Sequence, residues 1–303
     1  MSKIKDLLFI EEEFEYKVPF HVTNSVATTS RIITINLQLD NGITGLGQAS
    51  RSFRVNDEVY EGLLHYRTPI LEQIKGMDVR NYRQIFAEID KFSRTAPSLK
   101  AAIQYSVLDA LSQLVDLPVY QILGGKKDFV TTDLTIGIET LENTVNKALE
   151  AYEQGFDILK LKVGEDLKSD IDRVLAVAGK TKNASYIIDA NLGYTAKESL
   201  QFADIMYREG VDIVLFEQPV NTYDLEGLRL VRRNCHYPVG ADETVKTKYD
   251  ALQLIKNDCV DYINIKLMKS GISDALAIIE MARTAEVGLM IGCMGEAGLG
   301  IGQ

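Results

Sequence analysis

Six polar residues recur at nearly even intervals through the second half of the chain, and each lies in or ends a short apolar run. Gaps of 27, 27, 28, 25 and 24 residues separate them; they are Thr135, Lys162, Asp189, Glu217, Asp242 and Lys266. One strand and one helix together have this length. In a (β/α) barrel the carboxyl ends of the strands meet on one face, where active sites are built. The spacing therefore predicts that two lysines and three carboxylates converge on one pocket.

The same region alternates regularly between short apolar runs and amphipathic stretches. This pattern is typical of a parallel sheet with helices outside it. A doubly wound sheet is the alternative, but a polar residue at each strand end favours a barrel. A barrel has eight strands, so we expect the chain to stop at Gln303 before the last one. The seven predicted strands are 130–137, 157–163, 185–189, 212–217, 238–241, 260–266 and 287–293.

Residues 1–125 have a different pattern. Apolar runs at 4–18 and 31–40 predict strands, and Asn41–Gly42 is a strong hairpin signal before a third run at 43–50. Apolar residues at helical spacing follow. Strands followed by helices predict an α+β domain over 1–125, in front of a barrel domain over 126–303. The predicted helices are 57–75, 79–93 and 97–116.

Composition narrows the class of protein. A net charge of −10 argues against a nucleic-acid partner, because phosphate binding needs clustered Lys and Arg. Three cysteines without CxxC spacing favour free thiols in a reducing cytoplasm. No apolar run approaches the length of a membrane span, and acidic residues near the N-terminus argue against a signal peptide. We therefore expect a cytoplasmic protein without a membrane partner, and a homo-oligomer stays open.

Lys160 and Lys162 share one face of their predicted strand, because side chains alternate along a strand. The intervening Leu159, Leu161 and Val163 suit the helix layer, so both ammonium groups should face the barrel interior. A KxK pattern alone is more typical of a solvated surface strand. The apolar neighbours and the 27-residue step to the next polar strand end favour the interior.

Asp189, Glu217 and Asp242 end three consecutive predicted strands. Three carboxylates in one cavity repel one another unless a cation holds them. An all-oxygen ligand set suits Mg²⁺. Helix capping is the alternative role, but Gln218–Pro219 after Glu217 makes a poor cap. We therefore predict a Mg²⁺ site at these three residues.

Five motifs together resemble the enolase superfamily, its muconate-lactonizing subgroup, and within it the dipeptide epimerases. They are KLKVG at 160–164, DAN at 189–191, FEQP at 216–219, ADE at 241–243 and NIKLMKSG at 264–271. The resemblance implies an enolase-like fold, with an α+β capping domain and a modified (β/α)7β barrel. It further implies Lys162 and Lys266 as acid/base residues, Lys160 beside them, and Thr135 and Cys293 in contact with the dipeptide.

The activity that this resemblance implies is Mg²⁺-dependent epimerization of the C-terminal residue of an L-Ala-L-Xaa dipeptide. The two lysines would perform a 1,1-proton transfer through an enediolate. Cycloisomerase or o-succinylbenzoate synthase chemistry uses the same lysines and metal, and remains an alternative. A non-catalytic barrel that binds a ligand through the glycine-rich segment 292–303 is an alternative of another class. The presence of both lysines and all three carboxylates favours an enzyme.

Two departures from the epimerase pattern concern substrate recognition. Ser25 stands where the alanyl-glutamate epimerases that the chain resembles carry an arginine for the glutamate side chain. The family's ammonium-binding DxD on the last strand has no counterpart before Gln303. We therefore expect an apolar second residue in the substrate, unless Arg51 or Arg54 supplies the missing charge.

Overall fold

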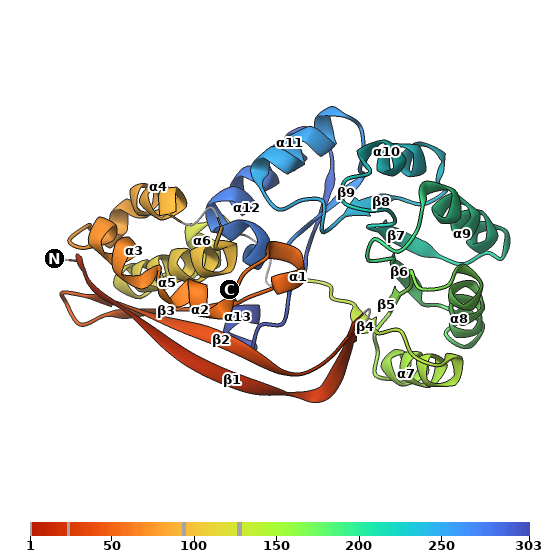
Figure 1. Ribbon diagram of the computed structural model, residues 1–303, viewed down its shortest axis with the longest axis horizontal. Coiled ribbons are helices and arrows are strands. Elements are labelled where there is room, and N and C mark those ends of the chain that lie inside the picture. The colour runs from red at the N-terminus through yellow and green to blue at the C-terminus, as the bar shows by residue number, and fades with distance from the viewer. Residues whose placement is uncertain (1, 23–24, 93–94, 126–128) are drawn as a thin grey trace.

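The structure is a computed structural model that describes residues 2–22, 25–92, 95–125 and 129–303. It contains a three-stranded sheet in the order β1-β2-β3 and a seven-stranded sheet in the order β10-β9-β8-β7-β6-β5-β4. Figure 1 shows the first sheet and its helices at one end, and the second sheet curled with helices outside it. This is the predicted enolase-like arrangement, with the parallel strands forming a half-barrel.

The first sheet belongs to the capping domain and consists of β1 (Ile4–Val22), β2 (Ser25–Leu39) and β3 (Thr44–Ser50). Both pairings are antiparallel, and Gly42 in the predicted hairpin turn has a φ of 91°. Helix α5 (Pro97–Val115) packs closely on β3. Gly47 permits this approach, because a Cβ there would lie 1.9 Å from the Ala102 carbonyl oxygen.

The prediction of one helix over 57–75 is wrong, because the segment forms two helices, α2 (Tyr60–Leu64) and α3 (Arg67–Ile74). The His65 and Tyr66 amides donate to carbonyls three residues back, at 3.3 and 3.2 Å, which tightens the turn and ends α2. The other predicted helices are confirmed as α4 (Tyr82–Phe92), after the 3₁₀ turn η1 (Val79–Asn81), and α5. Two short helices complete the domain, α1 (Phe53–Asn56) and α6 (Val119–Ile122).

All seven predicted parallel strands are confirmed, although most are shorter than expected. They are β4 (Leu134–Ile136), β5 (Ile158–Lys162), β6 (Ser185–Asp189), β7 (Ile213–Glu217), β8 (Val239–Ala241), β9 (Tyr262–Ile265) and β10 (Gly288–Ile291). The helices that follow these strands are α7 (Leu141–Glu153), α8 (Leu167–Lys180), α9 (Ala196–Arg208), α10 (Leu225–Asn234), α11 (Lys248–Lys256), α12 (Leu267–Thr284) and α13 (Gly298–Ile301).

Side-chain alternation along β5 follows the prediction. Leu159, Leu161 and Val163 are buried in the apolar layer between the sheet and its helices. Lys160 is also buried, on the opposite face of the strand. Burial of apolar side chains toward the helices therefore turns the lysines toward the inside of the curl.

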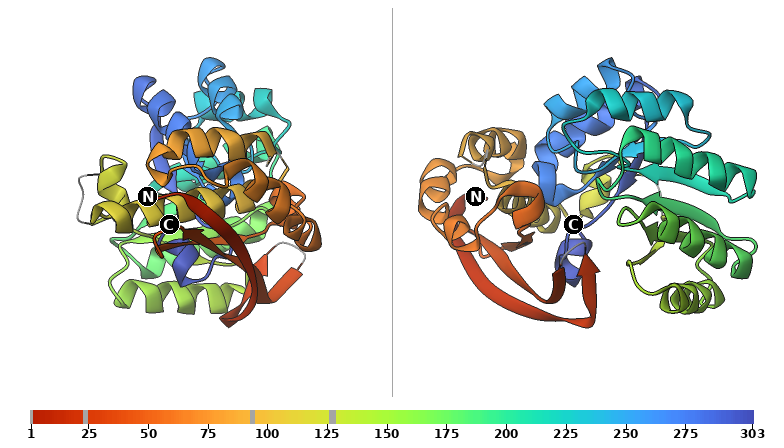
Figure 2. Two further views of the ribbon diagram at one scale, coloured as in Figure 1. Left: turned by 90° about the vertical axis from the view of Figure 1, so that its left-hand side faces the viewer. Right: turned by 45° about the vertical axis from the view of Figure 1, so that its right-hand side comes forward.

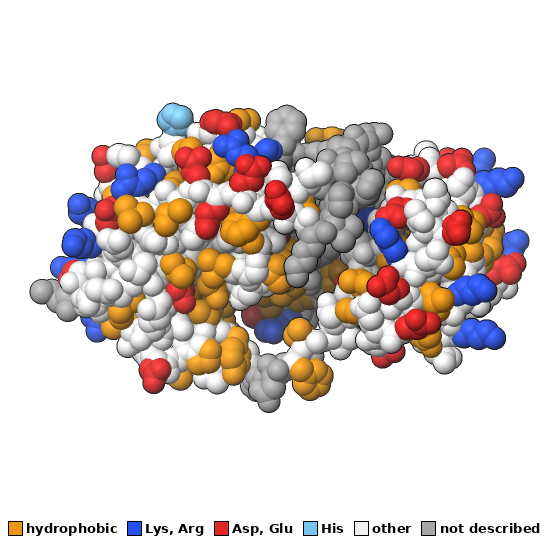
Figure 3. Space-filling model, turned by 90° about the horizontal axis from the view of Figure 1, so that it is seen from below, with side chains coloured by type: hydrophobic (Ala, Val, Ile, Leu, Met, Phe, Trp, Pro, Cys, Tyr) orange, Lys and Arg blue, Asp and Glu red, His pale blue; other side chains and the backbone are white. Residues whose placement is uncertain are grey.

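Helix packing and hydrogen bonds join the capping domain to the half-barrel. Helix α12 packs along α5, and α13 lies against β3 (Figure 2). Gln48 on β3 accepts hydrogen bonds from the Ala297 and Gly300 amides, at 3.1 and 3.0 Å. A hollow with apolar and basic side chains lies between the two halves of the molecule in the space-filling view (Figure 3). None of the described helices combines the length and the apolarity that a membrane span requires.

Candidate active site

Lys160 and Lys162 reach the carboxylates of the two strands that follow β5. Lys160 Nζ lies 2.8 Å from Asp189 Oδ2 and 2.6 Å from Glu217 Oε2. Lys162 Nζ lies 2.6 Å from the same Asp189 oxygen. One ammonium group therefore bridges two carboxylates, and a second contacts one of them.

The third carboxylate, Asp242, is held by lysines from the β9 side. Lys266 Nζ lies 2.5 Å from Asp242 Oδ2, and Lys269 Nζ lies 2.6 Å from Asp242 Oδ1. Asn264 on β9 donates to Glu217 Oε1 at 2.7 Å, which connects the two sides. The structure thus brings together six predicted residues, which are Lys160, Lys162, Asp189, Glu217, Asp242 and Lys266.

Burial and charge compete at these groups. Burial raises the pKa of Asp189, but the charges of Lys162 and Lys160 outweigh this effect and lower the pKa to about 2. Glu217 has a raised pKa because of burial and the neighbouring Asp189 charge. Burial lowers the pKa of Lys266, but Asp242 and Glu243 raise it to well above the ordinary value. The three carboxylates are fully buried, so their charges depend on the lysines that contact them.

Several residues with a structural part in the site were not predicted individually, although they lie inside the motifs. Lys162 donates to Asn191 Oδ1 at 2.5 Å, and Asn191 in turn donates to Glu243 at 2.9 Å. Gln218 Oε1 accepts from the Asp242 amide at 2.9 Å and thereby orients the strand end that carries that ligand candidate. In the sequence, the only sign of their role was that these polar residues lie within two positions of the predicted ones.

The predicted substrate contacts lie at the edges of the half-barrel. Thr135 is exposed on β4, in register with Lys160. Cys293 follows β10, and the residue is exposed although protein surrounds much of its thiol. Desolvation of the thiol and the Glu296 charge raise its pKa, while Lys266 and Lys160 lower it less. Ser25 begins β2, but its side chain and that of Arg54 lie outside the described residues, and Arg51 is exposed.

The three carboxylates fit a hard divalent cation by their chemistry. All offer oxygen atoms only, and two nearby acceptors, Glu243 Oε2 and Asn264 Oδ1, are buried without a hydrogen-bond partner. In the described part of the chain, no three His, Cys, Asp or Glu side chains already form a cluster that could hold an ion. Lysine ammonium groups contact the carboxylate oxygens instead.

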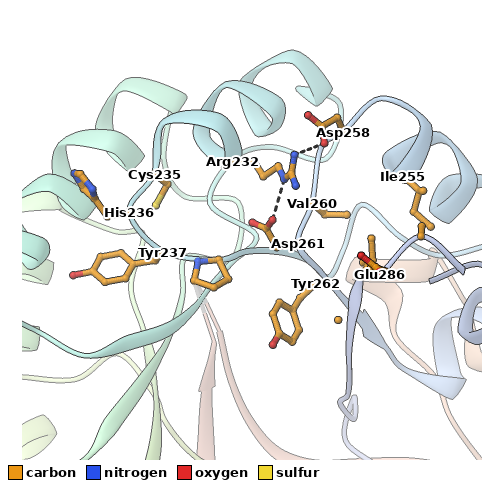
Figure 4. A pocket seen from close by; sticks show the side chains of 14 residues that line it. Arg232, Cys235, His236, Tyr237, Ile255, Asp258, Val260, Asp261, Tyr262 and Glu286 are labelled. Carbon is orange, nitrogen blue, oxygen red and sulfur yellow. Dashed lines mark hydrogen bonds and ion pairs between the residues drawn. The ribbon is translucent and has the colours of Figure 1, made fainter. Parts of the chain in front are cut away.

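A second hollow of about 740 Å³ lies at the opposite, amino-terminal ends of β8, β9 and β10 (Figure 4). Arg232 in its wall pairs with Asp258 and, at 3.0 Å, with Asp261. The predicted residues end the strands on the other side, so this hollow is separate from the lysine and carboxylate cluster.

Comparison with known proteins agrees with this geometry. Residues 4–124 match the mandelate racemase/muconate lactonizing enzyme N-terminal domain, and residues 143–303 match the enolase C-terminal domain-like family. The chain belongs to the enolase superfamily.

Among similar members of the superfamily, the L-Ala-D/L-Glu epimerase of Thermotoga maritima is 50% identical over 303 residues, covering 100% of this chain and 88% of that protein. A hydrophobic dipeptide epimerase of Enterococcus faecalis is 34% identical over 97% of this chain and 83% of its own length. A crystal structure of the Enterococcus faecalis dipeptide epimerase with Mg and L-Leu-L-Tyr superposes with a TM-score of 0.95, covering 99% of this chain and 85% of that one. Enzymes with these names are isomerases.

Proposed function

We propose that this enolase-superfamily protein is a dipeptide epimerase that inverts the α-carbon of the C-terminal residue of its substrate. The observation that carries the proposal is the approach of Lys162 and Lys266 to one group of buried carboxylates from β5 and β9. Three strands separate β5 from β9 in the curled sheet, so the two ammonium groups approach from different sides. The names of the similar proteins support the same reaction.

Asp189, Glu217 and Asp242 would hold the cofactor, which we propose to be Mg²⁺. When bound, the cation supplies positive charge at the substrate carboxylate, where negative charge accumulates as the α-proton leaves. The Mg complex of the Enterococcus faecalis enzyme supports this assignment. In the present structure, oxygens of these three carboxylates accept hydrogen bonds from lysines.

The proposed reaction needs one lysine as a base and the other as an acid. A neutral Nζ takes the α-proton from one face of the substrate, and the opposite ammonium group returns a proton to the other face, which inverts the stereocentre. Lys162 and Lys266 have matching surroundings for these roles, since each donates to a buried carboxylate. Lys160 bridges Asp189 and Glu217, and its ammonium group would help to compensate the negative charge of the intermediate.

Thr135 on β4 and Cys293, which follows β10, would contact the dipeptide from the two edges of the half-barrel. β4 and β10 lie beside β5 and β9, from which Lys162 and Lys266 approach the site. Gly292 leaves space for the Lys266 side chain, because a Cβ on residue 292 would lie 2.9 Å from Lys266 Cε. We further propose 1–125 and 126–303 as the two domains, with the substrate bound where they meet.

Two observations favour different second residues in the dipeptide substrate. Ser25 favours an apolar residue, because it carries no charge to pair with a glutamate. The 50% identity to an L-Ala-D/L-Glu epimerase favours glutamate, with Arg51 or Arg54 as the candidate partner. Cycloisomerase and o-succinylbenzoate synthase chemistry would use the same lysines, but the epimerase names of the similar proteins favour epimerization.

Incubation of the protein with a library of L-alanyl dipeptides in deuterated water, with Mg²⁺, tests the proposal. Mass spectrometry should detect deuterium at the α-carbon of the second residue, and chiral chromatography should detect both epimers. The Lys162→Ala/Lys266→Ala double variant is the matched control and should give neither signal. Absence of exchange from every dipeptide, with the protein folded and Mg²⁺ present, would contradict the proposed function and would leave a ligand-binding role.

A further inference from the structure

Helix α12, which follows the strand of Lys266, is broken one turn after it begins. Gly271 has φ 71° and ψ 173°, so the first turn, Leu267–Ser270, is separated from the rest of the helix. A side chain at this position would be strained, because L-residues rarely adopt such a φ. The break therefore divides α12 into a short turn beside the site and a long outer helix.

Two side chains of the capping domain contact α12 at the break. Gln104 of α5 is fully buried, and its Oε1 accepts from the Ile272 and Ser273 amides at 2.7 and 3.2 Å. These are amides at the start of the outer helix, where no intrahelical acceptor is available. Lys100, one turn earlier on α5, packs so closely on Gly271 that a Cβ there would lie 2.2 Å from its Cε.

A polar network holds these two side chains in place. Gln104 Nε2 donates to Asp90 Oδ1 and to Ser273 Oγ, both at 3.0 Å. Lys100 Nζ lies 3.2 Å from the same Asp90 oxygen and 3.9 Å from Asp274. Every polar atom of the Gln104 side chain thus has a partner, which fixes its orientation.

The short turn before the break carries a lysine into the site. Lys269, which is almost completely buried, donates to the Asp242 backbone oxygen at 2.5 Å and to the Asn264 backbone oxygen at 2.9 Å, in addition to its ion pair with Asp242. Lys266 immediately precedes the same turn and occupies the N-cap position of α12. A continuous α12 would rotate this turn and move both lysines relative to Asp242.

We propose that Gln104 and Lys100 of the capping domain are positioning residues for the β9 side of the active site: they hold α12 broken at Gly271 and so set the positions of Lys266 and Lys269. The capping domain then assembles one base of the reaction in addition to covering the substrate. Because the argument takes Lys266 as a base, it rests on the proposed epimerase function.

The test compares Gln104→Leu with Gln113→Leu, the same change on the same helix. Gln113 is exposed and donates to Thr44 O at 2.9 Å within the capping domain. We expect Gln104→Leu to lower kcat about 10- to 100-fold, as a misplaced catalytic group does, with KM within about threefold. Gln113→Leu should leave both constants unchanged. An unchanged kcat in folded Gln104→Leu would overturn the proposal.

A reciprocal exchange of polar groups separates positioning from general loss of stability. Gln104→Glu places a carboxylate against Asp90 and should lower kcat. In the double variant with Asp90→Asn, the new side-chain amide at position 90 can donate to the new carboxylate at position 104. This reverses the direction of the wild-type hydrogen bond, and kcat should recover by at least about tenfold. Failure of the double variant to recover kcat, while its melting temperature recovers, would overturn a positioning role.

Amide hydrogen exchange gives a readout that does not require catalysis. Gln104→Leu should speed exchange in the peptide that covers Lys266–Ala275, while the peptide over Leu141–Glu153 in α7 stays unchanged. If the wild-type protein epimerized no dipeptide, this exchange pattern would still test how α12 is held. Faster exchange without any wild-type epimerization would contradict the proposed function alone, and unchanged exchange would overturn the positioning of α12.

Discussion

The two lysines of the proposed reaction stand on structural supports of different kinds. Lys162 lies at the end of β5, and its contacts come from the adjacent strand β6 and the loop that follows it. Lys266 lies between β9 and a helix whose break is held by α5 of the capping domain. Strand alternation and contacts within the half-barrel direct the first lysine, whereas we propose that contact with the capping domain sets the second. The two sides should therefore respond differently to changes far from the substrate.

Replacement of the lysines themselves should have the largest effect on both sides. We expect Lys162→Ala and Lys266→Ala each to lower epimerization by about 10²–10⁴-fold, because each removes one acid/base group. Each variant should still exchange the α-proton of the one epimer that faces its surviving lysine, measured by NMR in deuterated water. Full epimerization in either single variant would contradict the two-base scheme.

Removal of the proposed metal should abolish the contributions of the Lys162 side and the Lys266 side to activity equally. Chelation should abolish activity, and Mg²⁺ should restore it; a holo crystal should show oxygens of the three carboxylates about 2.0–2.5 Å from one ion. Asp189→Asn and Asp242→Asn should each weaken Mg²⁺ binding, measured by calorimetry, by more than about 100-fold, since even indirect partners of a metal contribute 10- to 100-fold.

The matched control for the metal is Asp212→Asn, an exposed carboxylate that accepts from Ser185 at 2.6 Å at the other end of the strands. It should leave Mg²⁺ affinity unchanged. Equal loss of affinity in this variant would point to a general effect of charge rather than to ligation.

Gly271→Ala should lower activity as well as stability, because it disturbs the β9 side of the site. The positive φ and the close contact with Lys100 should together lower the free energy of unfolding by about 2–3 kcal/mol, measured by urea titration. Gly155→Ala is the control, because Gly155 also has a positive φ, 94°, but open space around it. It should cost about 1–2 kcal/mol from backbone strain alone and leave activity intact. Equal effects on activity at the two glycines would contradict the comparison.

Substrate choice should show the smallest effect. An unpaired buried carboxylate is costly, so we expect an L-alanyl dipeptide with an apolar or aromatic second residue to exceed L-Ala-L-Glu in kcat/KM by about tenfold, or about 1.4 kcal/mol. Competition assays with both dipeptides measure the ratio. A preference for L-Ala-L-Glu that disappears in Arg51→Ala or Arg54→Ala would show that a loop arginine replaces the charge that Ser25 lacks.

The sequence was sufficient to predict the order of the strands and the convergence of polar residues at their ends. Period-two alternation around Lys160 and apolar runs of strand length carry this information locally. The same local signals predicted the hairpin at Asn41–Gly42 and the long helix α5. The break between α2 and α3 was missed, because it depends on which carbonyls the His65 and Tyr66 amides reach.

The partners of each site residue were decided only by the tertiary structure. Nothing in the spacing of the chain predicts that Lys269 binds Asp242, or that Gln104 caps a helix 168 residues away. Strand spacing determines which side chains reach a common face, because backbone geometry repeats. Side-chain pairing depends on the packing of α5 against α12, and two helices far apart in sequence leave no periodic signal of their contact.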